Sequence, residues 1–518
     1  MLILIPQPRR VALAPGESPI SLAEHPAISI HSDLPAQGFR LHISPDGVRI
    51  EAADEAGAFY GKMTLRQILR QSDREVACCE IEDWPDFSVR GVMLDISRDK
   101  VPTMDTMFAL VDDLAEWKIN HLELYAEHTF AYHHHREVWE HASPITAEEI
   151  RHLDAYCHER FIELVPNQQS FGHFERWLKY PKYQHLAAGE VHSCLDPANP
   201  QSVALLEELY AELLPNFTSR KFNVGCDETY GIEGRVYLDF LLRIHELVKR
   251  HGRAMHFWGD IVLKHPELAE ALPRDVVVLE WGYEADHPFD EHGALFARSG
   301  IPFYVCPGTS SWNSIAGRTD NCLNNLRSAA ANGLKHGAIG FLNTDWGDNG
   351  HWQYLPVSYL GFAAGAALSW CYEANFHRDF VAALDAHVFR DSSRVMGRLA
   401  YDLGNAHLKA DCLMGNGSIL FQRLFSSTPD EVSPRKLQET AGTIRSFIAP
   451  LGRAQMQRPD AALIKAEFAN TARLLLAACE PERVDSKTIV DEHRRLWLAR
   501  NRPGGLADSL GKIRLNVA

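Results

Sequence analysis

Two neighbouring acids, Asp227 and Glu228, stand where an apolar run that predicts a β-strand comes to its end. Each carboxylate disfavours ionisation of the other, so holding the two together costs free energy. Proteins that keep such a pair often need one acid protonated and the other charged, as in general acid–base catalysis. A helix N-cap is the structural alternative, because Asp227 or Thr229 could cap a helix that starts a few residues later. This segment alone is equally compatible with both interpretations.

The elements that must position these acids follow a regular rhythm. From about residue 88 to residue 345, apolar segments rich in β-forming residues alternate with segments of helical periodicity. About eight strand–helix units over this length predict an α/β protein with a closed (β/α)8 TIM barrel. An open doubly wound sheet is the rival fold, but no glycine-rich phosphate loop follows the first strand. The predicted strands begin near Ser88, Ile119, Phe161, Lys221, Ala254, Val276, Pro302 and Gly337.

Two further segments flank the predicted barrel, which we assign to residues 86–375. Residues 1–85 are expected to form a small α+β domain. Within it, 39–43 and 48–52 alternate apolar and polar residues around the turn sequence SPDG, a pattern typical of a hairpin. Beyond the barrel the strand signals fade, and residues 376–518 are predicted to form an α-helical domain.

Polar and aromatic side chains follow the ends of most predicted strands. In a (β/α)8 barrel, the carboxyl ends of the strands carry the active site. A pyranose has apolar C–H faces that pack on indole rings, and its hydroxyls need carboxylates, amides and arginine. This combination of residue types therefore predicts a sugar site. Besides the acid pair, the candidates are Glu127, His173, Trp258, Trp281, Trp312, Asn313, Trp346 and Asp348, with Arg90 at the start of the first strand.

Composition excludes several classes of protein. The 518 residues carry a formal net charge of −16, which makes nucleic acid or an anionic membrane surface an unfavourable partner. No stretch reaches the ~20 apolar residues of a membrane span, and the apolar run 2–5 is too short for a secretion signal. The 10 cysteines include no CxxC pair, so we expect a reduced, cytoplasmic protein.

We expect no metal and no other cofactor. His133, His134 and His135 are consecutive, and successive residues point in different directions, so this run is more typical of a solvated loop than of a chelating site. A metal-dependent hydrolase built on this run remains a minor alternative. A nucleophile–base pair of Ser170 or Cys226 with His173 is disfavoured, because the chain has no GxSxG elbow.

Most of the first 375 residues resemble the β-N-acetylhexosaminidases of glycoside hydrolase family 20. The resemblance rests on SPDGVRIEAADEAGAFYGKMTLRQIL in the leading domain and on IEDWPDFSVRGVMLDISRD at the start of the barrel. The segment VGCDE matches the Gly-Asp-Glu signature of the family. The trailing helices and the segment LELYAEHTFAY resemble an intracellular bacterial subgroup.

This resemblance implies an exo-acting, retaining hydrolase that releases a terminal GlcNAc or GalNAc without an enzyme nucleophile. The 2-acetamido oxygen of the substrate would attack C1 and form an oxazolinium intermediate, a substrate-assisted exception among glycosidases. Glu228 would first be the general acid for the leaving oxygen and then the base that activates water. Asp227 would accept a hydrogen bond from the acetamido N–H and offset the charge that develops there.

The same resemblance implies how the sugar is held. Arg90 would clamp ring hydroxyls of the terminal sugar, and Asp348 would bind its distal hydroxyls. Glu127 would support His173 at the end of the third strand. The aromatic cage around the acetamido group and the ring would be formed by Trp258, Trp281 and Trp346.

Some positions depart from the family pattern. The third-strand motif PNQQSFGH lacks the acidic residue common there, and the tyrosine that contacts the acetamido oxygen has no clear counterpart. Trp312 falls near the expected spacing of that tyrosine, and Asn313 or Ser314 lies near the position of its partner carboxylate. These departures motivate a second hypothesis, a carbohydrate-binding barrel that has lost catalytic activity.

The expected partner is a small glycan or glycoconjugate that ends in a β-linked N-acetylhexosamine. The sequence does not choose between gluco and galacto substrates. It also leaves open both a monomer and a homodimer, although members of the family often dimerise.

Overall fold

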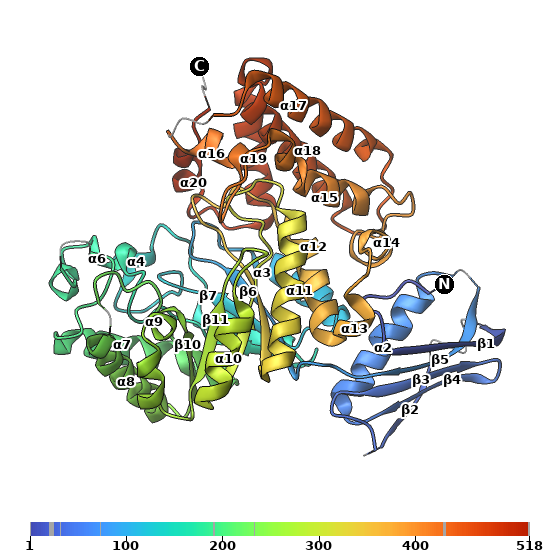
Figure 1. Cartoon of the computed structure of the whole chain (residues 1–518), viewed down its shortest axis with the longest axis horizontal. Coiled ribbons are helices and arrows are strands. Elements are labelled where there is room, and N and C mark those ends of the chain that lie inside the picture. Colours follow the sequence, from blue (N-terminus) through green and yellow to red (C-terminus); the bar gives the residue numbers. More distant parts are fainter. Residues whose placement is uncertain are drawn as a thin grey trace.

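The chain is divided into a small N-terminal sheet, a central barrel and a group of C-terminal helices (Figure 1). None of the helices in the part described is long and apolar enough to cross a membrane. The computed structural model describes residues 2–19, 25–31, 33–72, 74–189, 192–232, 234–427 and 431–515.

The N-terminal sheet has the strand order β1-β5-β3-β4-β2. The predicted hairpin is β3–β4, in which Ile43 pairs with Val48. Helix α2 (Glu55–Leu69) begins after Asp54, whose carboxylate accepts a hydrogen bond from the Gly57 N–H. Its apolar face packs on β3 and β4 and forms a core separate from that of the barrel. The strands are β1 (Arg10–Pro19), β2 (Ala27–Ile30), β3 (Phe39–Ser44), β4 (Gly47–Ala52) and β5 (Glu75–Asp83).

Eight parallel strands form the central sheet and lie in sequence order, with β13 paired to β6. A parallel bridge between Asn167 and Asn223 closes the ring beside β8 and β9, and the Gln168 N–H donates to the Asn223 carbonyl at 3.0 Å. The predicted (β/α)8 barrel is confirmed. Its strands are β6 (Val89–Asp95), β7 (His121–Tyr125), β8 (Glu163–Val165), β9 (Lys221–Asn223), β10 (Ala254–Trp258), β11 (Val277–Trp281), β12 (Phe303–Cys306) and β13 (Gly340–Asp345).

Side chains alternate between the two faces of each barrel strand. On β11, Leu279 and Trp281 belong to an aromatic cluster inside the barrel, together with Trp258 and Trp346. Val278, between them in sequence, packs outward into the core shared with the helices. The barrel interior is therefore filled with side chains, and the strand ends carry the groups that face a ligand.

The helices of the barrel connect successive strands and cover the outside of the sheet (Figure 1). The predicted capping box is present at the start of α5, where Thr146 and Glu149 each accept a backbone N–H of the other. The longer barrel helices are α3 (Met104–Glu116), α5 (Ala147–His158), α7 (Pro200–Leu213), α8 (Gly234–Arg250), α10 (Phe289–Ser299), α11 (Thr319–His336) and α12 (Leu355–Trp370). The shorter ones are α4 (Arg136–Trp139), α6 (Glu175–Leu178) and α9 (Asp260–Lys264).

The C-terminal part is helical, as predicted, and packs on the barrel loops. Trp352 Nε1 donates to the Ser509 carbonyl at 3.0 Å, and the Tyr354 hydroxyl lies 3.1 Å from His493 Nδ1. In Figure 1 these helices, orange to red, lie on one side of the barrel, while the blue N-terminal sheet lies on another. They are α13 (Tyr372–Asn375), α14 (Val381–Ala383), α15 (Met396–Gly404), α16 (Ile419–Phe425), α17 (Pro434–Ile448), α18 (Ala461–Cys479), α19 (Ser486–Arg500) and α20 (Leu506–Lys512).

Candidate active site

One cavity at the carboxyl end of the barrel strands gathers most of the predicted site residues. About 510 Å³ of space lies between its walls, part of it continuous with bulk solvent. Asp227, Glu228, His173 and Asp348 supply its acids and imidazole. The other residues in its wall are Arg98, Trp258, Trp281, Tyr283, Trp312, Trp346 and Asn416. A hollow with carboxylates and indole rings in its wall suits a ligand of the size and chemistry of a sugar.

Two donors hold the Asp227 carboxylate in place. Gln169 Nε2 donates to Asp227 Oδ1 at 2.6 Å, and His173 Nε2 lies 3.3 Å from Oδ2. Burial alone would raise the pKa of Asp227, but the charge of His173 and these hydrogen bonds outweigh burial and lower that pKa. Burial also opposes a charge on His173, yet Asp227 raises the pKa of His173 to about 9. At neutral pH the pair is therefore an ionised carboxylate beside a protonated imidazole.

The backbone that leaves β9 turns sharply through left-handed conformations. Gly225, Cys226 and Glu228 have φ values of 69°, 68° and 50°. A Cβ on Gly225 would lie 2.0 Å from Gln169 Oε1, so only glycine leaves room for that oxygen to accept the Cys226 N–H at 3.1 Å. A non-glycine residue in this conformation costs roughly 1–2 kcal/mol, which the surrounding contacts must offset. The turn places both acids in the cavity wall.

The two acids differ in their exposure to the cavity. The Asp227 side chain is 10% exposed, whereas the Glu228 side chain is 37% exposed. Glu228 Oε2 lies 3.5 Å from His173 Nε2, and the Glu228 N–H donates to Asp260 Oδ2 at 3.2 Å. Burial and the charge of Asp227 raise the pKa of Asp260 to about 7. Glu228 is thus the carboxyl that a leaving group or water can reach, while Asp227 is enclosed.

Indole rings and one phenol form the apolar wall. Tyr283 stacks on Trp281 with ring centroids 5.3 Å apart and meets Trp312 edge-on at 5.0 Å. The Nε1–H groups of Trp258, Trp281 and Trp346 are buried and have no hydrogen-bond partner among the residues that the structure describes. Buried donors without a partner are costly. The three Nε1 atoms are also closed off from solvent, so the indole rings present their faces and edges, not these donors, to the cavity.

Arg98 supplies the guanidinium of the cavity. It lies 3.3 Å from Asp95 Oδ2 and 3.2 Å from Glu127 Oε1, over the rings of Tyr125 and Trp346. Burial opposes its charge, but the surrounding anions raise the pKa of Arg98 well above its ordinary value. A guanidinium fixed on several sides presents its remaining N–H donors in a defined direction, which suits neighbouring hydroxyls.

The prediction that Arg90 clamps the sugar is wrong. Arg90 is fully buried at the start of β6, at the opposite end of the barrel from the cavity. Its guanidinium donates to the carbonyls of Lys118 and Phe87 at 2.9 and 2.8 Å and to Gln37 Oε1 at 2.9 Å. Arg90 therefore ties the N-terminal sheet to the barrel. The arginine in the cavity is Arg98, which follows the other end of the same strand.

Glu127 and Asn313 lie beside the cavity and outside its wall. Glu127 is buried next to Arg98 and accepts a hydrogen bond from the Tyr125 hydroxyl at 2.9 Å. Burial raises the pKa of Glu127, although Arg98 acts in the opposite direction. Asn313 Nδ2 donates to Asp348 Oδ2 at 3.3 Å. Glu127 therefore positions Arg98, and Asn313 positions Asp348, but neither residue lines the cavity.

Four residues of the site received no role from the sequence. Gln169 and Arg98 both follow strand ends. The clamp on the sugar hydroxyls was predicted for Arg90 instead of Arg98, and no role was predicted for Gln169. Tyr283 stands two residues after Trp281, a spacing that places both on one face of an extended segment and could have revealed it. Asn416 comes from the loop before α16, and its Oδ1 accepts the Trp312 Nε1–H at 2.9 Å. No local sequence pattern predicts this contact, because Trp312 and Asn416 are 104 positions apart.

Two alternative chemistries gain no support from the structure. Burial raises the pKa of the Cys226 thiol well above its ordinary value, which makes it a poor nucleophile. His133 and His134 are exposed, whereas His135 is buried with Nδ1 2.7 Å from the Tyr183 hydroxyl. The three consecutive histidines therefore do not face a common point.

The fold and the cavity define a (β/α)8 barrel protein with a pocket of carboxylates and indoles where such barrels carry their active sites. Residues 5–84 match the domain described as "Glycosyl hydrolase family 20, domain 2", and residues 87–233 match "Glycosyl hydrolase family 20, catalytic domain". The leading sheet and the first part of the barrel are therefore similar to glycoside hydrolase family 20.

Several known proteins are similar to this chain. Lacto-N-biosidase of Bifidobacterium bifidum is 24% identical over 277 residues, which are 48% of this chain and 24% of that protein. A beta-hexosaminidase of Porphyromonas gingivalis is 24% identical over 319 residues, 51% of this chain and 40% of that protein. The chain thus spans less than half the length of these relatives. The crystal structure of Flavobacterium johnsoniae chitobiase shares the fold, with a TM-score of 0.61, 18% identity and 99% coverage of both chains.

Proposed function

We propose that the protein is an exo-acting, retaining β-N-acetylhexosaminidase that releases terminal GlcNAc or GalNAc by substrate-assisted catalysis. The observation that carries this proposal is the contrast within the acid pair: Asp227 is enclosed and charged, while Glu228 is open to the cavity. The relatives with hexosaminidase names support the class of substrate. A related Vibrio harveyi structure with the same fold contains N-acetylglucosamine, the kind of ligand we propose here.

The first chemical step uses the substrate's own acetamido group. Its carbonyl oxygen attacks C1, the bond from C1 to the leaving oxygen breaks, and Glu228 gives its proton to that oxygen. The acetamido N–H donates a hydrogen bond to Asp227, whose negative charge offsets the positive charge of the oxazolinium product. Gln169 and His173 hold Asp227 in the orientation that this contact needs.

The second step returns the enzyme to its starting state. Glu228, now a carboxylate, takes a proton from water, and the water oxygen bonds to C1 on the face left by the aglycone. The C1–O bond of the oxazolinium ring breaks and the acetamido group is restored. Two inversions at C1 give net retention, so the enzyme itself forms no covalent bond.

The sugar is held by the walls of the cavity. We assign the indole rings of Trp258, Trp281 and Trp346, which line the cavity, to the sugar ring and the acetamido group. Arg98 and Asp348 are assigned to the hydroxyls of the terminal sugar, which makes the enzyme exo-acting. Tyr283 takes the place of the tyrosine that had no counterpart in the sequence.

The setting of the reaction is part of the same proposal. We place the protein in the cytoplasm, acting on a small glycan or glycoconjugate. All 10 cysteines are free thiols, nine of them buried, which supports a reducing compartment. Paired chromogenic gluco and galacto hexosaminides would establish the preferred sugar, and size-exclusion chromatography with light scattering would establish whether the chain dimerises.

The test is the Glu228→Gln variant, assayed on an aryl N-acetyl-β-glucosaminide. Losing the acid–base group should lower kcat by on the order of 100-fold or more. Glu159→Gln is the matched control, because that glutamate is 74% exposed on the surface. Near-normal turnover by Glu228→Gln would reject the assignment. Binding of N-acetylglucosamine by a wild-type protein that releases nothing from any aryl hexosaminide would instead favour an inactive carbohydrate-binding barrel.

A further inference from the structure

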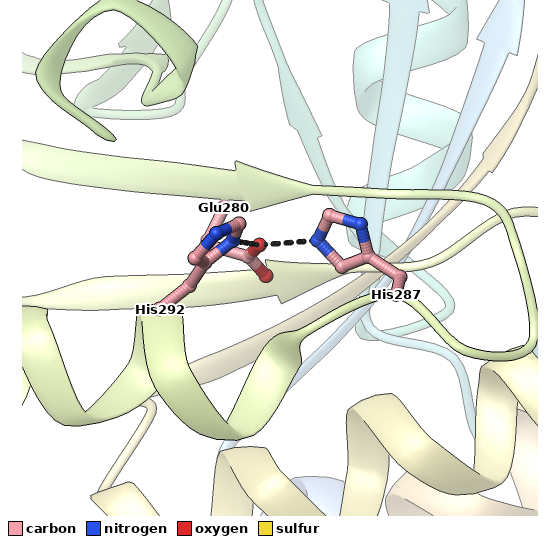
Figure 2. Close-up of side chains that lie close together, drawn as sticks. All are labelled: Glu280, His287 and His292. Atoms are coloured by element: carbon pink, nitrogen blue, oxygen red, sulfur yellow. Dashed lines mark hydrogen bonds and ion pairs between the residues drawn. The ribbon is translucent and has the colours of Figure 1, made fainter. Parts of the chain in front are cut away.

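A second cluster of charged and ligating side chains lies just outside the barrel, beside the sugar cavity. Glu280 is on β11, His287 is in the loop that follows, and His292 is in α10. Glu280 Oε1 lies 2.7 Å from His287 Nε2 and 2.8 Å from His292 Nδ1. Figure 2 shows both imidazole rings turned toward this carboxylate. The three ligand atoms lie within 4.8 Å of one another.

The Glu280 carboxylate is an unusual group to bury in this way. Its side chain is 1% exposed, and Oε2 is buried without a hydrogen-bond partner among the described residues. Among the residues that the structure describes, its ion-pair partners are His287 and His292, which are charged only when protonated. A buried carboxylate with one oxygen unpartnered and no permanent cation beside it is costly. A cation bound at Oε1, between the two imidazoles, would offset the charge of this carboxylate.

The loop is shaped to seat His287 against the backbone. A Cβ on Gly282 would lie 2.0 Å from His287 Nδ1, so a larger residue there would displace the imidazole. The φ of Gly282 is in the ordinary range, since it is not among the glycines with a left-handed backbone. Glycine is therefore needed at position 282, because the His287 imidazole occupies the space that a Cβ would fill.

We propose that Glu280, His287 and His292 form a binding site for a divalent transition metal of the zinc class. Two imidazole nitrogens and one carboxylate oxygen are a ligand set that zinc uses when a fourth position stays open to water. An open, solvent-filled hollow lined in part by His287 and His292 can supply that water. Ligand atoms of tetrahedral zinc lie about 3.3 Å apart, so the side chains need to separate by about half an ångström.

The metal would fix one wall of the sugar cavity. Residues 282–288 connect β11 to α10 and would be tied at both ends by the metal. Within this loop, Tyr283 lines the sugar cavity. Glu284 pairs with Arg318 at 2.8 Å and accepts the Asn416 N–H at 2.7 Å. This proposal departs from the expectation of no metal, and it places the metal away from the consecutive histidines at 133–135.

The test measures metal binding without any substrate, so it is independent of the proposed hydrolase activity. Tag-free protein is treated with a chelator, dialysed and titrated with Zn²⁺, and the bound metal is measured by mass spectrometry. We expect one zinc per chain with a Kd below about 1 µM, a rise in Tm on adding Zn²⁺, and no comparable effect of Mg²⁺ or Ca²⁺. A Co²⁺ titration should give the intense visible bands of a low-coordinate site. Wild-type protein that binds no zinc after dialysis would overturn the proposal.

Variants locate the metal on the chain. Glu280→Gln and His292→Gln should weaken zinc binding by at least tenfold, and Gly282→Ala should weaken it while leaving all three ligands in place. The control replaces the exposed His133 and His134 with glutamine and should bind zinc as wild type does. Loss of zinc in that control with retention in His292→Gln would place the metal elsewhere and contradict the proposal. Circular dichroism of the metal-free variants checks that they fold, and the Co²⁺ spectrum of the wild type decides the question if they do not.

Discussion

Gln169 Nε2 donates a 2.6 Å hydrogen bond to Asp227 Oδ1, while Gln169 Oε1 accepts the Cys226 N–H at 3.1 Å. The backbone N–H can only donate, so it fixes which end of the amide faces Asp227. Gln169 therefore acts as a positioning residue that presents a donor to the enclosed carboxylate. In the third-strand motif, glycoside hydrolase family 20 commonly has an acid that this chain lacks. Here the Gln169 amide in that motif orients Asp227.

Removing this donor should impair catalysis more than folding. Gln169→Ala is expected to lower kcat on an aryl N-acetylglucosaminide by about 10- to 100-fold, the loss for a hydrogen bond to a charged group. Circular dichroism and Tm should show a folded protein. A folded Gln169→Ala variant with unchanged kcat would show that Asp227 needs no partner from the third strand.

Arg90 lies in β6 and Arg98 in the loop after it. Variants of the two should distinguish a role in stability from a role in sugar binding. Arg98→Ala should lower kcat/KM by at least about tenfold, because Arg98 is the guanidinium in the sugar cavity. Arg90→Lys should lower Tm with little change in KM, because Arg90 joins the N-terminal sheet to the barrel through carbonyls and Gln37. Steady-state kinetics with thermal unfolding of both variants checks this. The reverse pattern would restore Arg90 as the sugar clamp.

The His173–Asp227 pair should make stability depend on pH. The pKa of His173 is raised from 6.5 to about 9, so its contribution is fully present below pH 6.5 and is lost as pH rises through 9. The pKa of Asp227 is lowered, so its contribution is lost only on acidification below its ordinary value of 3.8. Wild type should lose on the order of 1–3 kcal/mol of unfolding free energy between pH 6.5 and 9.5 that His173→Gln does not lose. Denaturant unfolding at both pH values measures this, and parallel pH profiles would contradict it.

The C-terminal part of the chain should contribute to sugar binding. Asn416 lines the cavity and accepts the Trp312 Nε1–H. Asn416→Ala should raise KM several-fold, with a smaller effect on kcat, because it loosens Trp312 without touching the acid pair. Asn405→Ala, a change in the same domain outside the cavity, is the control. Equal effects of the two variants on KM would show that Asn416 acts only through the stability of the domain.

Most of the fold and many residues of the cavity could be predicted from the sequence. Strand and helix periodicity predicted all eight barrel strands, because a parallel barrel needs nearly continuous apolar strands between amphipathic helices. The acid pair and four tryptophans could be placed at or just after strand ends for the same reason. Arg90 received the clamp role from the family resemblance alone, although it stands at the start of its predicted strand and such barrels carry their active sites at the carboxyl ends.

Other features depended on contacts between distant segments. Asn416 reaches the cavity from the helical part of the chain, and its role follows from how that part packs on the barrel. Glu280, His287 and His292 are seven and five residues apart, a spacing that matches no common metal motif. Only the turn after β11 brings their ligand atoms together.

The central claim is that the 2-acetamido group of the substrate is the nucleophile and that Asp227 steers it. The most direct test compares kcat/KM for an aryl N-acetyl-β-glucosaminide and the matching aryl β-glucoside, in wild type and in Asp227→Asn. We predict that wild type prefers the acetamido substrate by at least about 1000-fold and that Asp227→Asn removes at least about tenfold of that preference. A wild-type enzyme that cleaves the glucoside at a comparable rate, or an Asp227→Asn variant with undiminished preference, would contradict the account.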